Sequence, residues 1–259
     1  MKPDLVAPGA SVLTAYAHQQ GKTVQAYGTS LAGPVVAGNG AIIRQYFEEG
    51  HLPCDFADCS FDPSGSLIKA VLLNSAQSLK QVQVSLPGMN KKLLEEVTEY
   101  DNNQGMGLIQ LDKTLPILGY NKFNAVIKNN AEIADRGIID IFIMTTPGRC
   151  WNKPYKHDFS ATLTWYDPPG AISCAKCLVN DLDMIIHGIN AKGKVKAKSR
   201  VFPNGSTRKD YDNNVERIRF NMKGIKRYRI RIRGTNLSTA TTTFSMIATG
   251  CFKVIPKPS

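Results

Sequence analysis

The spacing of hydrophobic residues changes near residues 118–124, and this change most constrains the fold. Before it, apolar residues recur every three or four positions, as on one face of a helix. After it, they alternate with polar residues, as in half-buried strands. A chain of 259 residues is long enough for two modest domains. The pattern therefore predicts an α/β domain over residues 1–119 and an all-β domain over residues 122–259.

Two helices are predicted in the first part. Residues 30–49 carry apolar or small side chains around nearly the whole circumference of the first turns, which is typical of a helix buried on all sides. Pro34 falls in the first turn, where its missing N–H has no intrahelical partner. The second helix is predicted to begin after Ser64, as N-cap, and to end near Ser78.

The second part is predicted to form a β-sandwich or jelly roll, because its alternating segments are short and separated by turn residues. In residues 227–233, Tyr228, Ile230 and Ile232 alternate with four arginines, which indicates a half-buried strand with a basic outer face. The other predicted strands are residues 161–166, 182–187, 217–220 and 241–248.

The net charge of +11 is unevenly divided, with −3 over residues 1–119 and +14 over residues 120–259. Such a shift is typical of two units with different surfaces. Residues 192–233 alone hold 15 Lys and Arg against 3 Asp and Glu. This basic region makes binding of a polyanion, as a non-catalytic protein, an alternative function. No nucleic-acid motif accompanies it, so nucleic acid is not expected as a partner.

Cysteine number and hydropathy bear on the compartment. No apolar run approaches the ~18 residues of a membrane span, so none is expected in this chain. An even number of cysteines is compatible with disulfides, and hence with secretion or an endomembrane lumen. Cys174 and Cys177 have the spacing of half a zinc site, but no second pair completes it, and loop disulfides or buried thiols are favoured. The six cysteines are Cys54, Cys59, Cys150, Cys174, Cys177 and Cys251.

Residues 28–38, Gly-Thr-Ser-Leu-Ala-Gly-Pro-Val-Val-Ala-Gly, place a serine at the start of the first predicted helix. A serine hydroxyl is a poor nucleophile unless it is fixed at an exposed position beside a base. At a helix N-terminus its backbone is rigid, and free N–H groups face a developing oxyanion. Ser30 is therefore the candidate nucleophile, and the alternative is that it only caps the helix.

The same segment resembles the serine motif of the subtilases, Gly-Thr-Ser-Met-Ala-x-Pro-x-Val-Ala-Gly, with Leu31 in place of Met. Residues 2–9, 62–76 and 104–109 resemble three further subtilase motifs, in the order in which the family carries them. The resemblance implies a subtilisin-like serine endopeptidase that cleaves polypeptides through an acyl-enzyme on Ser30, without a cofactor for the chemistry. It also implies that residues 1–119 form the C-terminal part of a parallel-sheet α/β catalytic domain.

The second part of the chain is similar to a subgroup of that family. Residues 163–170, 178–183 and 212–216 resemble the jelly-roll domain that follows the protease domain in certain alkaline-type subtilases. The resemblance therefore extends over nearly the whole chain.

The resemblance also shows which catalytic groups cannot be assigned. Subtilases carry their triad in the order Asp, His, Ser, and the oxyanion asparagine also precedes the serine. Only 29 residues precede Ser30, so we expect a fragment that lacks these groups and is inactive in isolation. A non-catalytic remnant that supports a partner through its β-domain is a further alternative. No catalytic role is assigned to the four histidines, His18, His51, His157 and His187.

Oxygen-bearing turn residues in the second part predict a possible structural calcium site, with ordinary Asx turns as the alternative. These residues are Asp167, Asn180, Asp181, Asp183, Asp212 and Asn213.

Overall fold

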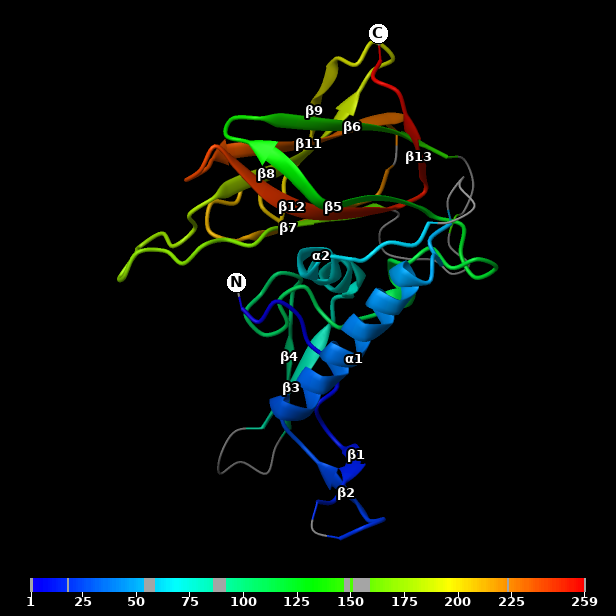
Figure 1. Ribbon diagram of the computed structural model, residues 1–259, viewed down its shortest axis with the longest axis vertical. Coiled ribbons are helices and arrows are strands. Elements are labelled where there is room, and N and C mark those ends of the chain that lie inside the picture. Colours follow the sequence, from blue (N-terminus) through cyan, green and yellow to red (C-terminus); the bar gives the residue numbers. More distant parts are fainter. Residues whose placement is uncertain are drawn as a thin grey trace.

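The computed structural model describes residues 2–17, 19–53, 59–85, 92–146, 150, 159–222 and 224–258, and it is mostly β-sheet with few helices (Figure 1). As predicted, the second part is all-β, with its strands in two antiparallel sheets packed face to face. One sheet has the strand order β10 (Val215–Phe220), β7 (Phe159–Thr164), β12 (Thr241–Gly250), β5 (Asn124–Ala134). The other has the order β13 (Phe252–Ile255), β6 (Ile138–Thr145), β11 (Arg227–Asn236), β8 (Asp181–Ile189), β9 (Val195–Val201).

The core of this β-sandwich lies between the two sheets and follows from the alternation in the sequence. Tyr228, Ile230 and Ile232 are buried, whereas the arginines between them lie on the outer face of β11. Trp165, directly after β7, is also buried, and its indole N–H donates to the carbonyl oxygen of Asn180 over 3.0 Å. Each fully buried large apolar side chain contributes ~1.5–3 kcal/mol, so alternation is enough to hold the sheets together.

Helix α1 (Thr29–Glu48) coincides closely with the predicted helix at residues 30–49, but it is not buried on all sides. The residues buried in it are Ile43, Tyr46 and Phe47, all in its second half, whereas Ile42 is 54% exposed. No sheet in the described part of the chain covers its first turns. These turns lie on the side away from the β-sandwich, toward the β1–β2 hairpin (Figure 1). The expected complete burial was wrong for this reason.

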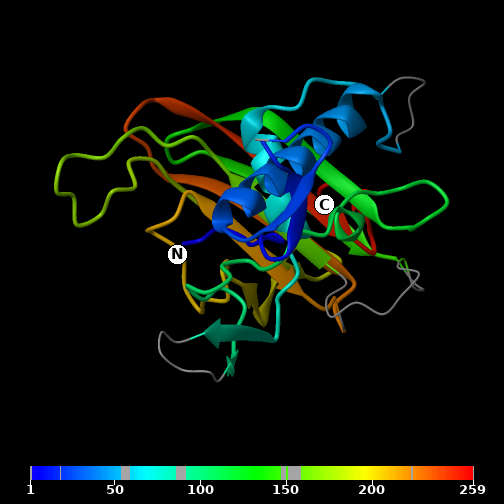
Figure 2. The ribbon, with the colours of Figure 1, turned by 90° about the horizontal axis from the view of Figure 1, so that it is seen from below.

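Helix α2 (Gly65–Ser75) lies between α1 and the four-stranded sheet (Figure 1). Seen from below, α1 and the β1–β2 hairpin lie over the middle of the molecule (Figure 2). Ser64 caps α2 as predicted, because its Oγ accepts the N–H of Leu67 over 3.1 Å. One apolar cluster joins the two helices to the sandwich. Its buried members are Ile43, Tyr46, Phe47, Leu67, Ala70, Val71, Leu115 and Ile247.

Polar side chains are also buried between α2 and the four-stranded sheet. Asn74 is fully buried, and its side-chain oxygen accepts hydrogen bonds from Ser160 (2.7 Å) and Thr162 (3.0 Å) of β7. Its amide donates to Thr249 Oγ1 of β12 over 3.0 Å. The contact between the helices and the sandwich is therefore hydrogen-bonded as well as apolar.

The parallel sheet expected for residues 1–119 is nearly absent from the residues that the structure describes. The parallel pairing found there is an isolated bridge between Val6 and Leu108. The named strands instead form two antiparallel hairpins, β1 (Val12–Ala15) with β2 (Thr23–Ala26) and β3 (Gln81–Ser85) with β4 (Lys92–Glu96). A 3₁₀ turn, η1 (Leu111–Lys113), precedes the sandwich. Within the described ranges, no helix is both long and apolar enough to cross a membrane.

Candidate active site at Ser30

Ser30 lies in the first turn of α1, with its side chain exposed to solvent. Gly28 is the N-cap residue, and its φ of 148° lies in a region that favours glycine. The N–H of Leu31 donates to the carbonyl of Gly28 over 3.1 Å and closes the turn that carries the serine. Among the described residues, Ser30 Oγ has no hydrogen-bond partner. Its backbone is thus fixed while its hydroxyl is open to a substrate.

The turn at Pro8 and Gly9 packs directly against the start of α1. The N–H of Gly28 donates to the carbonyl of Gly9 over 2.8 Å. A Cβ atom at Gly9 would lie 2.6 Å from the carbonyl oxygen of Gly28 and 3.2 Å from Cβ of Ala32. Any larger residue at position 9 would therefore displace the helix start. The Pro-Gly turn positions Ser30.

The other motif segments converge on the same region. The N–H of Val6 donates to the carbonyl of Gly107 over 2.9 Å. The N–H of Gln77, just after α2, donates to the carbonyl of Leu108 over 2.7 Å. The four segments singled out in the sequence are thus neighbours in space, and together they hold the start of α1.

The start of α1 also provides favourable electrostatics for an oxyanion. The first N–H groups of a helix have no intrahelical acceptor, and the macrodipole places partial positive charge there. The first turn of α1 holds no acidic residue that would compete with an anion. This arrangement can stabilise negative charge that develops on a carbonyl oxygen near Ser30.

No histidine among the described residues lies beside Ser30. His51 follows the far end of α1, where its ring contacts the Glu49 carboxylate at 2.9 Å. His187 lies in β8 of the sandwich. His18 and His157 lie outside the described residues. The structure thus gives no described histidine the position of a general base for Ser30, in agreement with the decision to assign none from the sequence.

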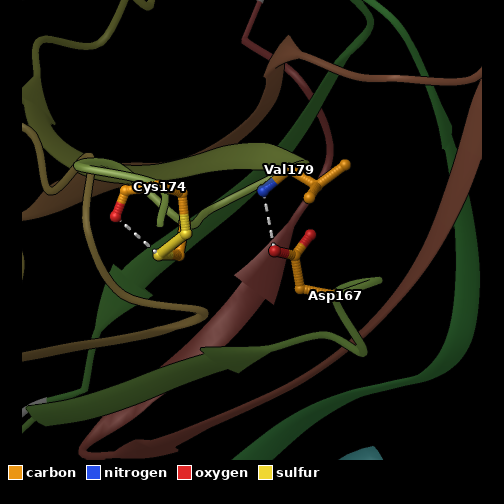
Figure 3. Close-up of a disulfide and its surroundings, with 4 residues drawn as sticks. Asp167, Cys174 and Val179 are labelled. Atoms are coloured by element: carbon orange, nitrogen blue, oxygen red, sulfur yellow. Dashed lines mark hydrogen bonds between the residues drawn. A yellow bond between two sulfur atoms is a disulfide. The ribbon is translucent and has the colours of Figure 1, made fainter. Parts of the chain in front are cut away.

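The residues predicted as calcium ligands are divided among separate hydrogen-bond networks. Asp167 accepts the backbone N–H of Val179 over 2.8 Å (Figure 3) and that of Asn180 over 2.7 Å, at the far end of the loop that Asp167 begins. The side-chain oxygen of Asn180 accepts the N–H of Ser238 over 2.9 Å. The oxygens of these two side chains therefore accept hydrogen bonds from the protein itself, those of Asp167 within its loop and that of Asn180 from the loop between β11 and β12.

Asp212 and Asn213 belong to a second loop, in which their backbone N–H groups donate to Asp210 over 2.9 and 3.1 Å. In the described part of the chain, no three acidic, histidine or cysteine side chains gather in a way that could hold a metal ion. The six predicted ligands therefore do not converge, and calcium stays a prediction.

Asp181 and Asp183 at the start of β8 form a mostly buried acidic cluster with Glu216 of β10. Each of the three has one carboxylate oxygen without a hydrogen-bond partner among the described residues. Burial, reinforced by the charge of Asp183, raises the pKa of Asp181 to about 6. Burial also raises the pKa of Glu216 well above its usual value. The ammonium group of Lys209 pairs with Asp183 and supplies positive charge to the cluster.

The described cysteines are all in disulfides, as the favoured interpretation predicted. Cys150, between β6 and β7, pairs with Cys251, between β12 and β13, and Cys174 pairs with Cys177 in the loop beside Asp167 (Figure 3). A disulfide offers no thiolate to a metal, so the zinc alternative for Cys174 and Cys177 is wrong. Cys59 is also disulfide-bonded, and Cys54 lies outside the described residues. These disulfides are compatible with an extracellular or lumenal protein.

Several arginines of the basic region in the second part already pair with acidic side chains of the chain itself. Arg231 makes two hydrogen bonds of 2.7 Å to Asp140, which also lies 3.8 Å from Arg229. Arg217 is fully buried and pairs with Glu99 over 2.7 Å. Part of the predicted polyanion surface is therefore neutralised within the chain.

The sequence did not indicate that His187 is buried between two arginines. It is buried on the outer side of the five-stranded sheet, paired with Arg229 of β11 and Arg200 of β9. The alternating sequence of β11 predicts that its arginines lie on the outer face. Only the strand register shows that Arg229 and Arg200 flank His187 there. No local pattern in the sequence carries that information.

Comparison with known proteins supports the motif analysis. Residues 1–107 match the subtilase family, peptidase S8. Over 95% of its length, the chain is 28% identical to the serine protease/ABC transporter B family protein tagA of Dictyostelium discoideum. It is 24% identical to each of the related proteins tagB and tagD of that organism, over 96% of its length. The chain spans only 14–16% of the length of these three relatives.

Proposed function

We propose that this chain, whose residues 1–107 match the subtilase family, carries the serine-bearing part of a subtilisin-like serine endopeptidase. The observation that carries the proposal is the position of Ser30, exposed in the first turn of α1 and held there by Gly9 and Gly28. In this proposal Ser30 is the nucleophile and polypeptides are the substrates.

The chemistry assigned to Ser30 is acyl transfer. Its Oγ forms an ester with the acyl carbon of the scissile peptide bond while the C–N bond breaks. A general base takes the proton from Oγ and passes it to the leaving amine. Water then hydrolyses the ester, which releases the acid and restores Ser30. The N–H groups at the start of α1 stabilise the oxyanion in both steps.

In this proposal, the histidine that acts as general base for Ser30, and the carboxylate that orients it, come from a part of the polypeptide outside these 259 residues. This assignment rests on the lack of a described histidine near Ser30 and on the much greater length of the curated relatives. Segments that supply these groups would also cover the exposed first turns of α1.

The second part is assigned the role of a jelly-roll domain that supports the catalytic part. Strands β5, β7, β10 and β12 lie in one sheet and β6, β8, β9, β11 and β13 in the other. Successive strands change sheets at every step except from β8 to β9, which supports the jelly-roll interpretation. The disulfides support an extracellular or lumenal location for the whole protein.

Active-site labelling tests the assignment of Ser30. A fluorophosphonate probe should label the longer polypeptide that includes the sequence upstream of this chain, and peptide mapping should place the label on Ser30. Ser30→Ala should abolish labelling and proteolysis, because no other group can form the acyl-enzyme. The matched control is Ser206→Ala, which removes an exposed hydroxyl from a loop of the sandwich and should leave both unchanged.

Labelling that survives Ser30→Ala would refute the assignment of the nucleophile. Failure of the longer polypeptide to react, although it is folded, would favour the alternative of a non-catalytic remnant.

A further inference from the structure

A small pocket lies on the outer face of the five-stranded sheet, on the layer of the sandwich that does not contact α2. Its volume is about 190 Å³, below the ~300–1,000 Å³ of sites for drug-sized ligands. It therefore suits a small group. The residues that line it include Arg200, Lys209, Arg231, Arg233, His187 and Ile185.

The strand register explains why basic side chains meet there. His187 of β8 pairs with Arg229 on β11 and with Arg200 on β9, so the three form one row across adjacent strands. Residues paired in this way have Cβ atoms roughly 4.5–5.5 Å apart. In the neighbouring rows of the same face, Arg231 pairs with Ile185 and Arg233 with Asp183. Cations from β9 and β11 thus surround one histidine.

The acids near the pocket neutralise only part of this charge. Asp183 pairs with Lys209, and Asp140 pairs with Arg231 and lies close to Arg229. Arg200 and Arg233 are exposed, and neither makes an ion pair within the described part of the chain. Two guanidinium groups at the pocket thus have their hydrogen-bond donors free for a ligand.

His187 is an incompletely satisfied group in this pocket. It is 6% exposed, and its Nδ1 has no hydrogen-bond partner among the described residues. Buried polar atoms nearly always have a partner, so this one is unusual. Burial lowers the pKa of His187 to about 4, and Arg229, Arg200 and Arg231 add to the effect, whereas Asp140 opposes it. The ring is neutral near pH 7, and two of the cations around the pocket, Arg200 and Arg233, have no acidic partner among the described residues.

We propose that this pocket binds a single sulfate or phosphate group, as a free anion or as a monoester. Arg200 and Arg233 donate charge-assisted hydrogen bonds to the oxyanion, and His187 donates a further one. Ile185 offers an apolar contact to the body of an ester. Because Asp140 and Asp183 interrupt the basic face, the pocket suits one anionic group rather than an extended polyanion. This site is independent of Ser30 and of the proposed peptidase function.

Titration calorimetry of the 259-residue chain with sulfate, at constant ionic strength in chloride, tests the proposal. Sulfate should bind saturably at one site. Arg200→Gln combined with Arg233→Gln should weaken binding at least tenfold, because two charge-assisted hydrogen bonds are lost. The matched control is Arg136→Gln combined with Lys192→Gln, which removes the same net charge from exposed turns outside the pocket. It should change the affinity less than twofold.

Titrations with a monosaccharide monosulfate and the corresponding monophosphate distinguish the sources of the group. Tighter binding of either ester than of free sulfate identifies that ester, and equal binding identifies the free anion. Absence of saturable sulfate binding by the unmodified chain would overturn the proposal. An equal loss of affinity in the pocket pair and the control pair would also overturn it, because general electrostatics would then explain the binding.

The pH dependence of sulfate affinity gives a second readout of His187. An anion in the pocket offsets Arg200, Arg229 and Arg231, so it raises the pKa of His187 and favours the imidazolium. Sulfate affinity should therefore rise as pH falls from 7 to 5. His187→Asn should reduce this dependence while the protein stays folded, and the part that remains follows Asp181, whose pKa is about 6 and which interacts with Asp183 and Lys209. An unchanged pH profile in His187→Asn would exclude the histidine from the site.

Discussion

The guanidinium of Arg217, on β10 of the sandwich, donates a hydrogen bond to the backbone carbonyl of Leu73 near the end of α2 over 2.9 Å. It also reaches the carbonyl of Ala76 (3.0 Å) and the carboxylate of Glu99 (2.7 Å). The last carbonyls of a helix lack intrahelical donors, so one sandwich side chain satisfies the end of α2. Arg217 therefore joins the helical layer to the sandwich.

Replacing Arg217 should destabilise the chain strongly. Arg217→Met removes the donors to α2 and leaves Glu99 with only the longer 3.6 Å contact to Arg219, which should lower the free energy of unfolding by about 3–5 kcal/mol. Arg217→Lys should have a smaller effect, because it keeps the charge but not the planar set of donors. Urea unfolding of the 259-residue chain measures both.

The control for this series is Arg136→Met, at a side chain that is 83% exposed. It should change the free energy of unfolding by no more than about 0.5 kcal/mol. A loss for Arg217→Met as small as that of the control would contradict the role assigned to Arg217.

The burial of Arg217 could not be predicted from the sequence. The alternation of β10 placed it correctly on the face opposite the core, where a charged residue normally meets water. It is buried because α2, some 140 residues earlier in the chain, covers that face. By contrast, the Ser64 cap and the apolar spacing that define α2 are local, and both were predicted.

Four strands of the second part, β5, β6, β9 and β13, were not predicted, and in two of them, β5 and β9, the backbone is locally irregular. In β5, Asn130 has a φ of +50° and the pairing with β12 shifts between Phe244 and Met246, so the alternation is broken. In β9, Lys198 has a φ of +55° and exposed lysines dominate the segment. The segment that carries Ser30 was recognisable from its motif, whereas the contacts of Gly9 with the helix start are tertiary and emerged only in the structure.

The two described disulfides should contribute unequally to stability. Cys150 and Cys251 are 101 residues apart, whereas Cys174 and Cys177 are 3 apart. In the chain-entropy treatment, removing the long-loop disulfide costs about 5 kcal/mol and removing the short-loop one about 2 kcal/mol. Paired Cys→Ser variants, compared by denaturant unfolding, measure the difference. A larger loss from the Cys174 and Cys177 pair would contradict this ranking.

The acidic cluster should make stability fall as pH rises from about 4 to about 6. The pKa of Asp181 is about 6 in the folded chain, above the value of ~3.9 for an unfolded aspartate. Between these two pKa values the folded state binds more protons than the unfolded state. The free energy of unfolding therefore decreases as pH rises from about 4 to about 6. Asp181→Asn should raise the melting temperature at pH 7, with no gain at pH 4.

Thermal unfolding between pH 4 and pH 7 tests this expectation, with Asp212→Asn as the control at an exposed acid of a nearby loop. The control should retain the wild-type profile. A wild-type profile that becomes flat when calcium is added would show instead that a cation binds at Asp181 and Asp183, two of the six predicted ligands.

The 259-residue chain alone should have no measurable peptidase activity. No described histidine can act as base for Ser30, and loss of a triad member removes several orders of magnitude of rate. Assay of the purified chain with a fluorogenic peptide checks this, with Ser30→Ala as the control for contaminating proteases. Turnover that disappears in Ser30→Ala would show that the chain supplies its own base.

Residues 122–259 should fold on their own, whereas residues 1–119 should not. The large apolar core of the sandwich lies entirely between its two sheets. On the outer face that α2 covers, the side chains of β7 are Ser160, Thr162 and Thr164, which water can solvate once the helix is removed. The loss of apolar burial on that face falls mainly on Ile247 and on Val215 of β10, which packs with Leu73, Ala76 and Met106.

The helical part has no comparable core of its own. Leu67 and Val71 of α2 are fully buried in a cluster that includes Ile247, so the sandwich completes it. Each such side chain contributes ~1.5–3 kcal/mol when buried, and the loss of several approaches the ~5–15 kcal/mol stability of a whole domain. Expressed separately, residues 122–259 should therefore melt cooperatively, while residues 1–119 should aggregate or bind a hydrophobic dye. Cooperative melting of soluble residues 1–119 would mean that α1, α2 and the hairpins form a complete fold without the sandwich.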